Sequence, residues 1–188
     1  MKTLRAALPN VAIFVLMVVC TLIIDAILHL SGRPEWGRQL GYLGTMLLVL
    51  SFAYSLRKRK WIKRGKPLRF LRAHEFLAWL GALLVLVHAG IHFNALLPWL
   101  ATAAMLVAVA SGLIGKYLLS QSKSIVSIHR SALLEQGLTS KEAEEHLHWD
   151  ALAVEMMKKW RTVHMPVTWL FGFLALLHIA TAILFWGW

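Results

Sequence analysis

Five long apolar stretches follow one another along the chain, separated by polar or charged segments. They run approximately over residues 8–30, 40–56, 74–96, 98–119 and 163–188. A helix of roughly 20 apolar residues spans the hydrocarbon core of a bilayer, and each stretch comes close to that length. The pattern predicts an all-α integral membrane protein, a single membrane domain over residues 1–188 with about five transmembrane helices.

One sizeable polar segment, residues 120–162, lies between the fourth and fifth stretches. Thr139 and Glu142 have the spacing of a helix capping box, and no Gly or Pro occurs from Ser140 to Arg161. Apolar residues recur there among Glu and Lys, which predicts an amphipathic cytoplasmic helix before the last span. Such a helix lies on the membrane surface, docks a partner protein, or is a solvated linker.

The composition supports a membrane protein. Of the 188 residues, 59% are hydrophobic and only 15% are charged, more apolar than a soluble domain of this size and far from a disordered chain. Cys20 is the one cysteine, which excludes an intrachain disulfide and a C-x-x-C-H site for covalent haem.

The net charge of +11 is distributed unevenly and predicts the topology. Nine Lys and Arg residues fall within residues 57–72, between the second and third stretches. If that loop is cytoplasmic, the N-terminus is also cytoplasmic, the C-terminus is outside, and every Lys and Arg except Arg33 and Arg38 is on the cytoplasmic side. We therefore expect a multi-pass protein of a bacterial or archaeal cytoplasmic membrane. Its basic surface suits anionic membrane lipid, and no nucleic-acid partner is expected.

Four of the nine histidines form a pattern. His74 and His88 lie 14 residues apart in the third stretch, and His164 and His178 lie 14 apart in the fifth. Fourteen helical residues return a side chain to within roughly 40° of its starting face and rise about 21 Å. Because the third and fifth spans run in the same direction, His74 should be level with His164 on the cytoplasmic side, and His88 with His178 toward the outside.

Two matched imidazole pairs favour haem, whose iron takes an axial imidazole on each face. Zinc requires three or four ligands close together, and an isolated copper would not explain two layers. Gly81, seven residues from both His74 and His88, leaves room either for macrocycles or for close helix packing. Arg72 and Arg161, beside the cytoplasmic pair, are placed to bind haem propionates, although the positive-inside bias also accounts for them.

Two His-x13-His helices separated by one helix resemble the di-haem cytochrome b architecture. It is found in the cytochrome b of quinol–cytochrome c reductases and, more loosely, in ferric-reductase-type transmembrane domains and small bacterial cytochromes b. The resemblance covers approximately residues 70–188. It implies that His74, His88, His164 and His178 are the axial ligands of two haem b groups, and that the chain transfers electrons in or across the membrane, often with quinone.

The chain has neither a Rossmann-type G-x-G-x-x-G nor a C-x-x-C cluster. Flavin or iron–sulfur chemistry is therefore expected in a partner subunit. A multihaem protein on the outer side is an equal alternative. The chain itself carries no candidate catalytic residue and is expected to be the electron-transfer subunit of a membrane oxidoreductase.

Three further polar residues lie toward the outer side. His92 lies one turn beyond His88. We expect it either to serve in a proton relay or quinone site, or to be a polar residue at the membrane interface. Asp25 and His29, four residues apart on the first span, predict a carboxylate–imidazole pair suited to exchanging protons with a quinone, or a polar contact between helices.

Two functions of other classes remain open. In a cofactor-free membrane scaffold or assembly factor, the histidines would only hold helices together. In a metal or proton transporter, the same histidines would carry the cargo.

Overall fold

The computed structural model describes residues 2–90, 95–137, 139 and 151–185, and every regular element in those ranges is a helix. Five segments are long and apolar enough to cross a membrane: Leu8–Leu30, Trp36–Lys58, Pro67–Ala89, Leu96–Ser120 and Lys158–Phe185. They belong to the helices α1 (Lys2–Leu30), α2 (Trp36–Ser51), α3 (Ala53–Lys58), α4 (Pro67–Ala89), α5 (Leu96–Glu135) and α7 (Ala151–Phe185). The predicted all-α fold with five spans of membrane length is confirmed.

The bounds of the third span differ most from the prediction of 74–96. Helix α4 begins at Pro67, whose fixed φ and missing N–H suit the first turn of a helix. It ends at Ala89, because Gly90 has a φ of +57° that breaks the helical path. Arg69 and Arg72 therefore lie on the helix and not in the preceding loop. His88 is in the last turn of α4, whereas His74 is two turns inside it.

The second span is longer than the predicted 40–56 and is interrupted. Helix α2 ends at Ser51, and α3 continues after Phe52. The N–H of Phe52 bonds the carbonyl of Val49 at 3.0 Å, a tighter turn than the α-helical pattern. This break leaves the last carbonyls of α2 without their usual helical donors.

The polar segment at residues 120–162 is described in part. Helix α5 continues past its span to Glu135, and α7 begins at Ala151 and runs into the last span without interruption. Residues 140–150 of the predicted amphipathic helix lie outside the described residues. Residues 151–161 are helical and, as predicted, lead into the last span.

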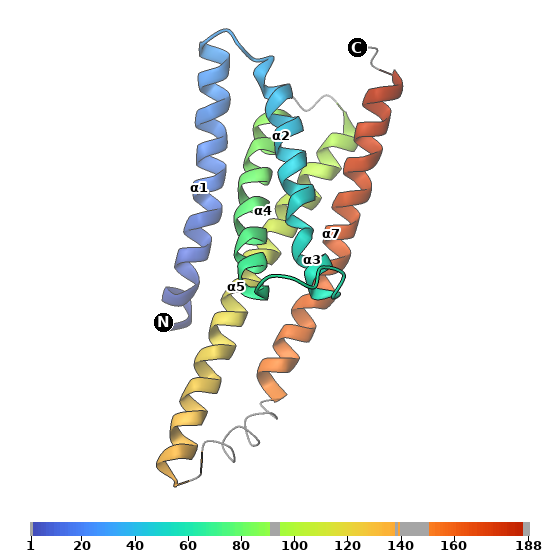
Figure 1. Ribbon diagram of the computed structural model, residues 1–188. Coiled ribbons are helices and arrows are strands. Elements are labelled where there is room, and N and C mark those ends of the chain that lie inside the picture. The colour runs from blue at the N-terminus through green and yellow to red at the C-terminus, as the bar shows by residue number, and fades with distance from the viewer. Residues whose placement is uncertain (1, 91–94, 138, 140–150, 186–188) are drawn as a thin grey trace.

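The helices pack as two pairs with α1 beside them (Figure 1). Helix α2 packs along α4 and α5 along α7, while α1 contacts mainly α4 and α5. The buried core lies where α1, α4 and α5 meet, and consists of Met17, Ala82, Leu83, Val87 and Met105. Large apolar side chains on the outer surfaces of all five spans are exposed, as expected for helices in contact with lipid.

The turns and helix ends are divided between two ends of the bundle. The beginning of α1, the α3–α4 turn, the end of α5 and the beginning of α7 lie at one end, shown at the bottom of Figure 1. The α1–α2 turn and the end of α7 lie at the other. We call these the basic end, after the cations of residues 57–72, and the far end. Helices α1, α4 and α7 all run from the basic end to the far end.

Candidate functional site

The four paired histidines lie on α4 and α7. At the far end, the ring centres of His88 and His178 are 6.4 Å apart, and the ring planes are inclined by 48°. At the basic end, His74 of α4 and His164 of α7 lie near each other. The structure thus brings together a far-end pair (His88 and His178) and a basic-end pair (His74 and His164), the same partners that the sequence spacing predicts.

Within the described residues, α4 and α7 do not pack directly against each other. No Cα atom of α4 lies within 8 Å of a Cα atom of α7. Helix α2 packs against α4, and α5 packs against α7. The side chains of His88 and His178 extend from α4 and α7 into the space between these two helices. His88 is exposed even though it lies next to both α2 and His178.

The far-end pair has the separation that one iron between two imidazoles requires. An imidazole nitrogen lies about 2.0–2.1 Å from a bound transition metal, and the ring centre lies about 1.2 Å behind that nitrogen. Two such rings in line have centres about 6.4 Å apart. The ring centres of His88 and His178 are also 6.4 Å apart, with planes inclined by 48°, and this separation is compatible with a bis-imidazole haem.

Helix α2 contacts both α4 histidines. Nδ1 of His74 donates to the carbonyl oxygen of Ser51 at 3.1 Å. The ring of His88 lies against Gly41 and near the backbone of Gly37. A neutral imidazole has one N–H, so a donating Nδ1 leaves the lone pair of Nε2 free for a metal. Metal-binding histidines typically have such a partner, which fixes the tautomer and the ring orientation.

The α2 residues beside the two histidines recur at the same interval as the histidines. Gly37 and Ser51 are 14 residues apart, as His74 and His88 are. Because α2 and α4 are antiparallel, Gly37 lies beside His88 and Ser51 beside His74. Ser51 is the last residue of α2, and the break at Phe52 makes its carbonyl one of those available to an outside donor.

Glycines let α2 approach α4 and its histidines closely. A Cβ atom on Gly41 would lie 2.5 Å from Cγ of His88, and one on Gly44 would lie 2.8 Å from the carbonyl oxygen of Gly81. A Cβ on Gly81 would in turn lie 2.9 Å from the carbonyl oxygen of Gly44. Of the two roles predicted for Gly81, the structure therefore places it in close helix packing. It faces α2 and does not open space toward α7.

On α7 the surroundings of His164 are different. Its ring stacks on Trp160, with ring centres 4.9 Å apart and planes inclined by 19°. Trp160 donates from Nε1 to the carbonyl oxygen of Ser111 at 2.7 Å. A Cβ on Gly115 would lie 2.3 Å from the Trp160 ring, so α5 receives this indole on a glycine. Nδ1 of His164 is buried and has no hydrogen-bond partner among the described residues.

Several charges surround the basic-end pair. Arg72 and Arg161, the predicted propionate partners, are both exposed, and the charge of Arg161 repels that of Lys58 on α3. Glu75, next to His74, forms an ion pair with Lys116 of α5 at 2.8 Å. The like charges of Lys58 and Arg161 would be stabilised by an anionic group between them.

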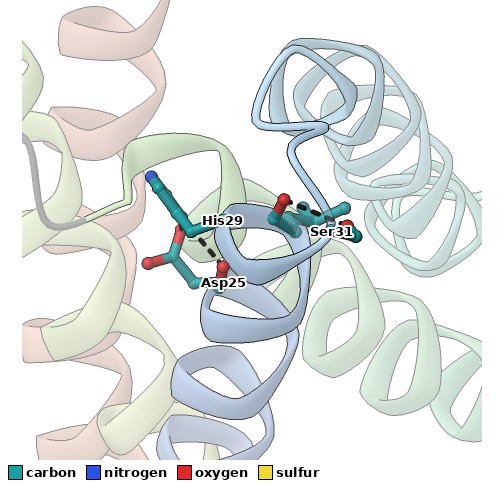
Figure 2. A network of polar contacts seen from close by, with 4 residues as sticks. Asp25, His29 and Ser31 are labelled. Atoms are coloured by element: carbon teal, nitrogen blue, oxygen red, sulfur yellow. Dashed lines mark hydrogen bonds and ion pairs between the residues drawn. The ribbon is translucent and has the colours of Figure 1, made fainter.

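The polar pair on α1 is present at the far end (Figure 2). Asp25 is buried, with 5% of its surface exposed, whereas His29 is exposed. Nδ1 of His29 lies 2.9 Å from the backbone oxygen of Asp25 and 3.6 Å from its carboxylate oxygen Oδ1. Both side chains project to the same side of α1 in Figure 2, away from the α1–α2 turn. The predicted third member, His92, lies outside the described residues.

Sequence reasoning did not find the residues that support the histidines: Gly37, Gly41, Ser51, Tyr54, Ser111 and Trp160. Backbone carbonyls carry no residue-type signal, so Ser51 and Gly37 could be found only by their spacing. Gly37, Gly41 and Gly44 do form a small-residue pattern typical of close helix contacts. This pattern indicates that another helix packs closely against α2.

Comparison with known proteins identifies no family. No family model matches the chain, and no curated protein and no solved structure gives a match. Within the described residues, no group of three or more His, Cys, Asp or Glu side chains is placed to hold a metal ion. The assignment of a cofactor therefore rests on the two-histidine geometry and on the surroundings of each ring.

Proposed function

We propose that this chain is a di-haem b-type electron-transfer subunit of a membrane oxidoreductase. Bound haem supplies reversible one-electron chemistry. His88 and His178 would hold one haem at the far end, and His74 and His164 would hold the other at the basic end. The two histidines on each helix are about 21 Å apart along the helix axis. The two haem sites would therefore let an electron cross the bilayer in two steps.

The observation that carries this proposal is the 6.4 Å separation of the His88 and His178 rings, which lie on two helices whose described Cα atoms nowhere come within 8 Å of each other. Histidines that only held α4 against α7 would be expected to bond each other or the backbone across that gap. Nδ1 of His74 instead bonds α2, and Nδ1 of His88 lies against Gly41 of α2, so the other nitrogen of each ring is available on the α7 side.

An absorption spectrum of the purified protein tests the proposal directly. We expect a reduced b-type spectrum and a pyridine-haemochrome stoichiometry of about two haems per chain. A colourless preparation would contradict the proposal. If that preparation also took up no metal it would support a scaffold, and if it took up metal or protons it would support a transporter.

The basic end is the surface at which we place a soluble redox partner. The side chain of Arg57 donates from Nε to the carbonyl oxygen of Gly65 at 3.1 Å and so closes the α3–α4 turn. The cations between them are exposed: Lys58, Arg59, Lys60, Lys63 and Arg64. An acidic iron–sulfur or flavin subunit would be steered to this surface, which also suits anionic lipid. A multihaem protein at the far end is the alternative partner.

At the far end, the pair of Asp25 and His29 supports a quinone as the membrane-borne partner. A carboxylate in a membrane span is costly and is a functional candidate by default. The exposed His29 and the buried Asp25 would pass protons between the surface and a quinone headgroup, while electrons pass to or from the far-end pair.

The proposed orientation places the basic end in the cytoplasm. In a Cys20→Ser background, we expect Lys63→Cys to react with a membrane-impermeant maleimide only in inverted vesicles. Glu35→Cys, at the far end, should react in intact spheroplasts. Both positions are exposed, so each provides the control for the other. The reverse pattern of labelling would contradict the orientation that the positive-inside rule predicts.

A further inference from the structure

The two imidazoles of the basic-end pair are held in unlike ways. The ring of His74 is fixed twice, by the hydrogen bond from Nδ1 to Ser51 at 3.1 Å and by stacking on Tyr54 at 5.6 Å between ring centres. The hydrogen bond sets both the tautomer and the rotation of the ring. Loss of the Tyr54 ring would therefore leave His74 still oriented.

In the part of the chain that the structure describes, His164 has the second kind of support alone. Its Nδ1 is buried and bonds none of those residues, and its ring stacks closely on Trp160. Trp160 is itself anchored, because its indole N–H bonds the carbonyl of Ser111 and its ring lies on Gly115 of α5. The orientation of His164 therefore depends on an aromatic neighbour that α5 holds in place.

The backbone of α7 adds little rigidity at this point. Pro166 lies inside the helix two residues beyond His164. Because proline has no N–H, the carbonyl of Thr162 lacks its helical donor. His164 is thus carried by a turn of α7 with a missing backbone hydrogen bond, whereas His74 lies in a stretch of α4 without proline.

We propose that Trp160 is the positioning residue for His164, and that His164 is the displaceable ligand of the basic-end site. This inference rests on the proposed haem function and specifies which of the two axial histidines is displaced more easily. An imidazole whose second nitrogen donates to a carbonyl is a stronger and better oriented ligand than one without that bond. When Trp160 no longer holds the ring, a small neutral ligand such as carbon monoxide should compete with His164 for ferrous iron.

Carbon monoxide binding to the dithionite-reduced protein tests this inference. We expect Trp160→Leu to bind carbon monoxide at one of its two haems, and to retain that haem 10- to 100-fold more weakly, as is usual when a residue that orients a metal ligand is lost. Trp160→Phe keeps a stacking ring without the anchor to Ser111 and should show a smaller effect. Tyr54→Leu should remain six-coordinate, because His74 keeps its bond to Ser51.

Gly172→Ala is the matched control, since a Cβ at Gly172 would meet nothing within 4 Å. Retention of the far-end haem reports that each variant has folded. The inference is overturned if Trp160→Leu binds no more carbon monoxide than Gly172→Ala, or if Tyr54→Leu binds it equally well. Should Trp160→Leu lose both haems, Trp160→Phe decides the question by the same comparison. A wild-type protein without haem would instead contradict the proposed function itself.

Discussion

Substitution of His88 by alanine is expected to lower the haem content from about two to about one per chain, which is the largest single effect that the proposal implies. An alanine methyl group offers no ligand, and His178 alone would leave the iron without its second imidazole. The remaining haem should keep a low-spin b-type spectrum, because His74 and His164 belong to a separate pair. Pyridine-haemochrome analysis and electron paramagnetic resonance of the oxidised protein measure both quantities.

The pairing itself can be tested by combining substitutions. His178→Ala should remove the same spectral component as His88→Ala, and the double variant should lose no more than either single variant, because residues that bind one group act as a unit. His74→Ala and His164→Ala should together define the other component. His146→Ala, a histidine of the polar segment, is the control and should retain both haems. Complete loss of haem in the double variant, with only half lost in each single one, would contradict the assignment of partners.

The sequence predicted the spans best where the apolar run was uninterrupted. The first span, Leu8–Leu30, has the predicted bounds because no charge occurs between its ends apart from Asp25. The third was misplaced because Arg69 and Arg72 were assigned to a loop. Long cationic side chains on the first turns of a membrane helix can extend to the interface, so charge alone does not mark where a helix begins. Pro67 and Gly90 were the better boundary signals.

The sequence predicts the pairing of the histidines, because that pairing depends on helical periodicity. The interval of 14 residues fixes which histidines share a face and a level, and the structure brings the same residues together. Periodicity does not reveal what lies behind each ring. The bond from His74 to Ser51 depends on the break at Phe52, and the stacking of Trp160 on His164 depends on Gly115 of another helix. Both are tertiary features that no local pattern specifies.

The polar contacts of the site also explain why α2 belongs to it. Helix α2 carries no histidine, yet its backbone bonds His74 and its glycines let it approach the ring of His88. In a membrane, helices associate through close packing of small residues and through hydrogen bonds, since lipid offers no hydrophobic driving force between them. The same contact that holds α2 in the bundle therefore also orients two of the four imidazoles.

Gly44→Ala should consequently affect both haem sites, although Gly44 touches neither histidine pair. The new Cβ would lie 2.8 Å from the carbonyl oxygen of Gly81 and 2.9 Å from the side chain of Val85, and the backbone atom cannot move aside cheaply. Overpacking of this kind typically costs about 1–3 kcal/mol. Displacement of α2 would also weaken the bond from His74 to Ser51 and shift the contact of His88 with Gly41, so both haems should be retained about 10- to 100-fold less tightly.

Thermal unfolding in detergent, followed by both protein aggregation and haem release, measures this effect. Gly172→Ala is the matched control, because it makes the same chemical change in a helix where the new methyl group meets nothing within 4 Å. Replacing glycine by alanine in an open helical position stabilises by about 0.5–1 kcal/mol, so the two variants should shift the melting temperature in opposite directions. If Gly44→Ala melted and released haem like Gly172→Ala, α2 would not be the element that orients the α4 histidines. Loss of one haem alone would show that Ser51 and Gly37 act independently, and not through a common displacement of the helix.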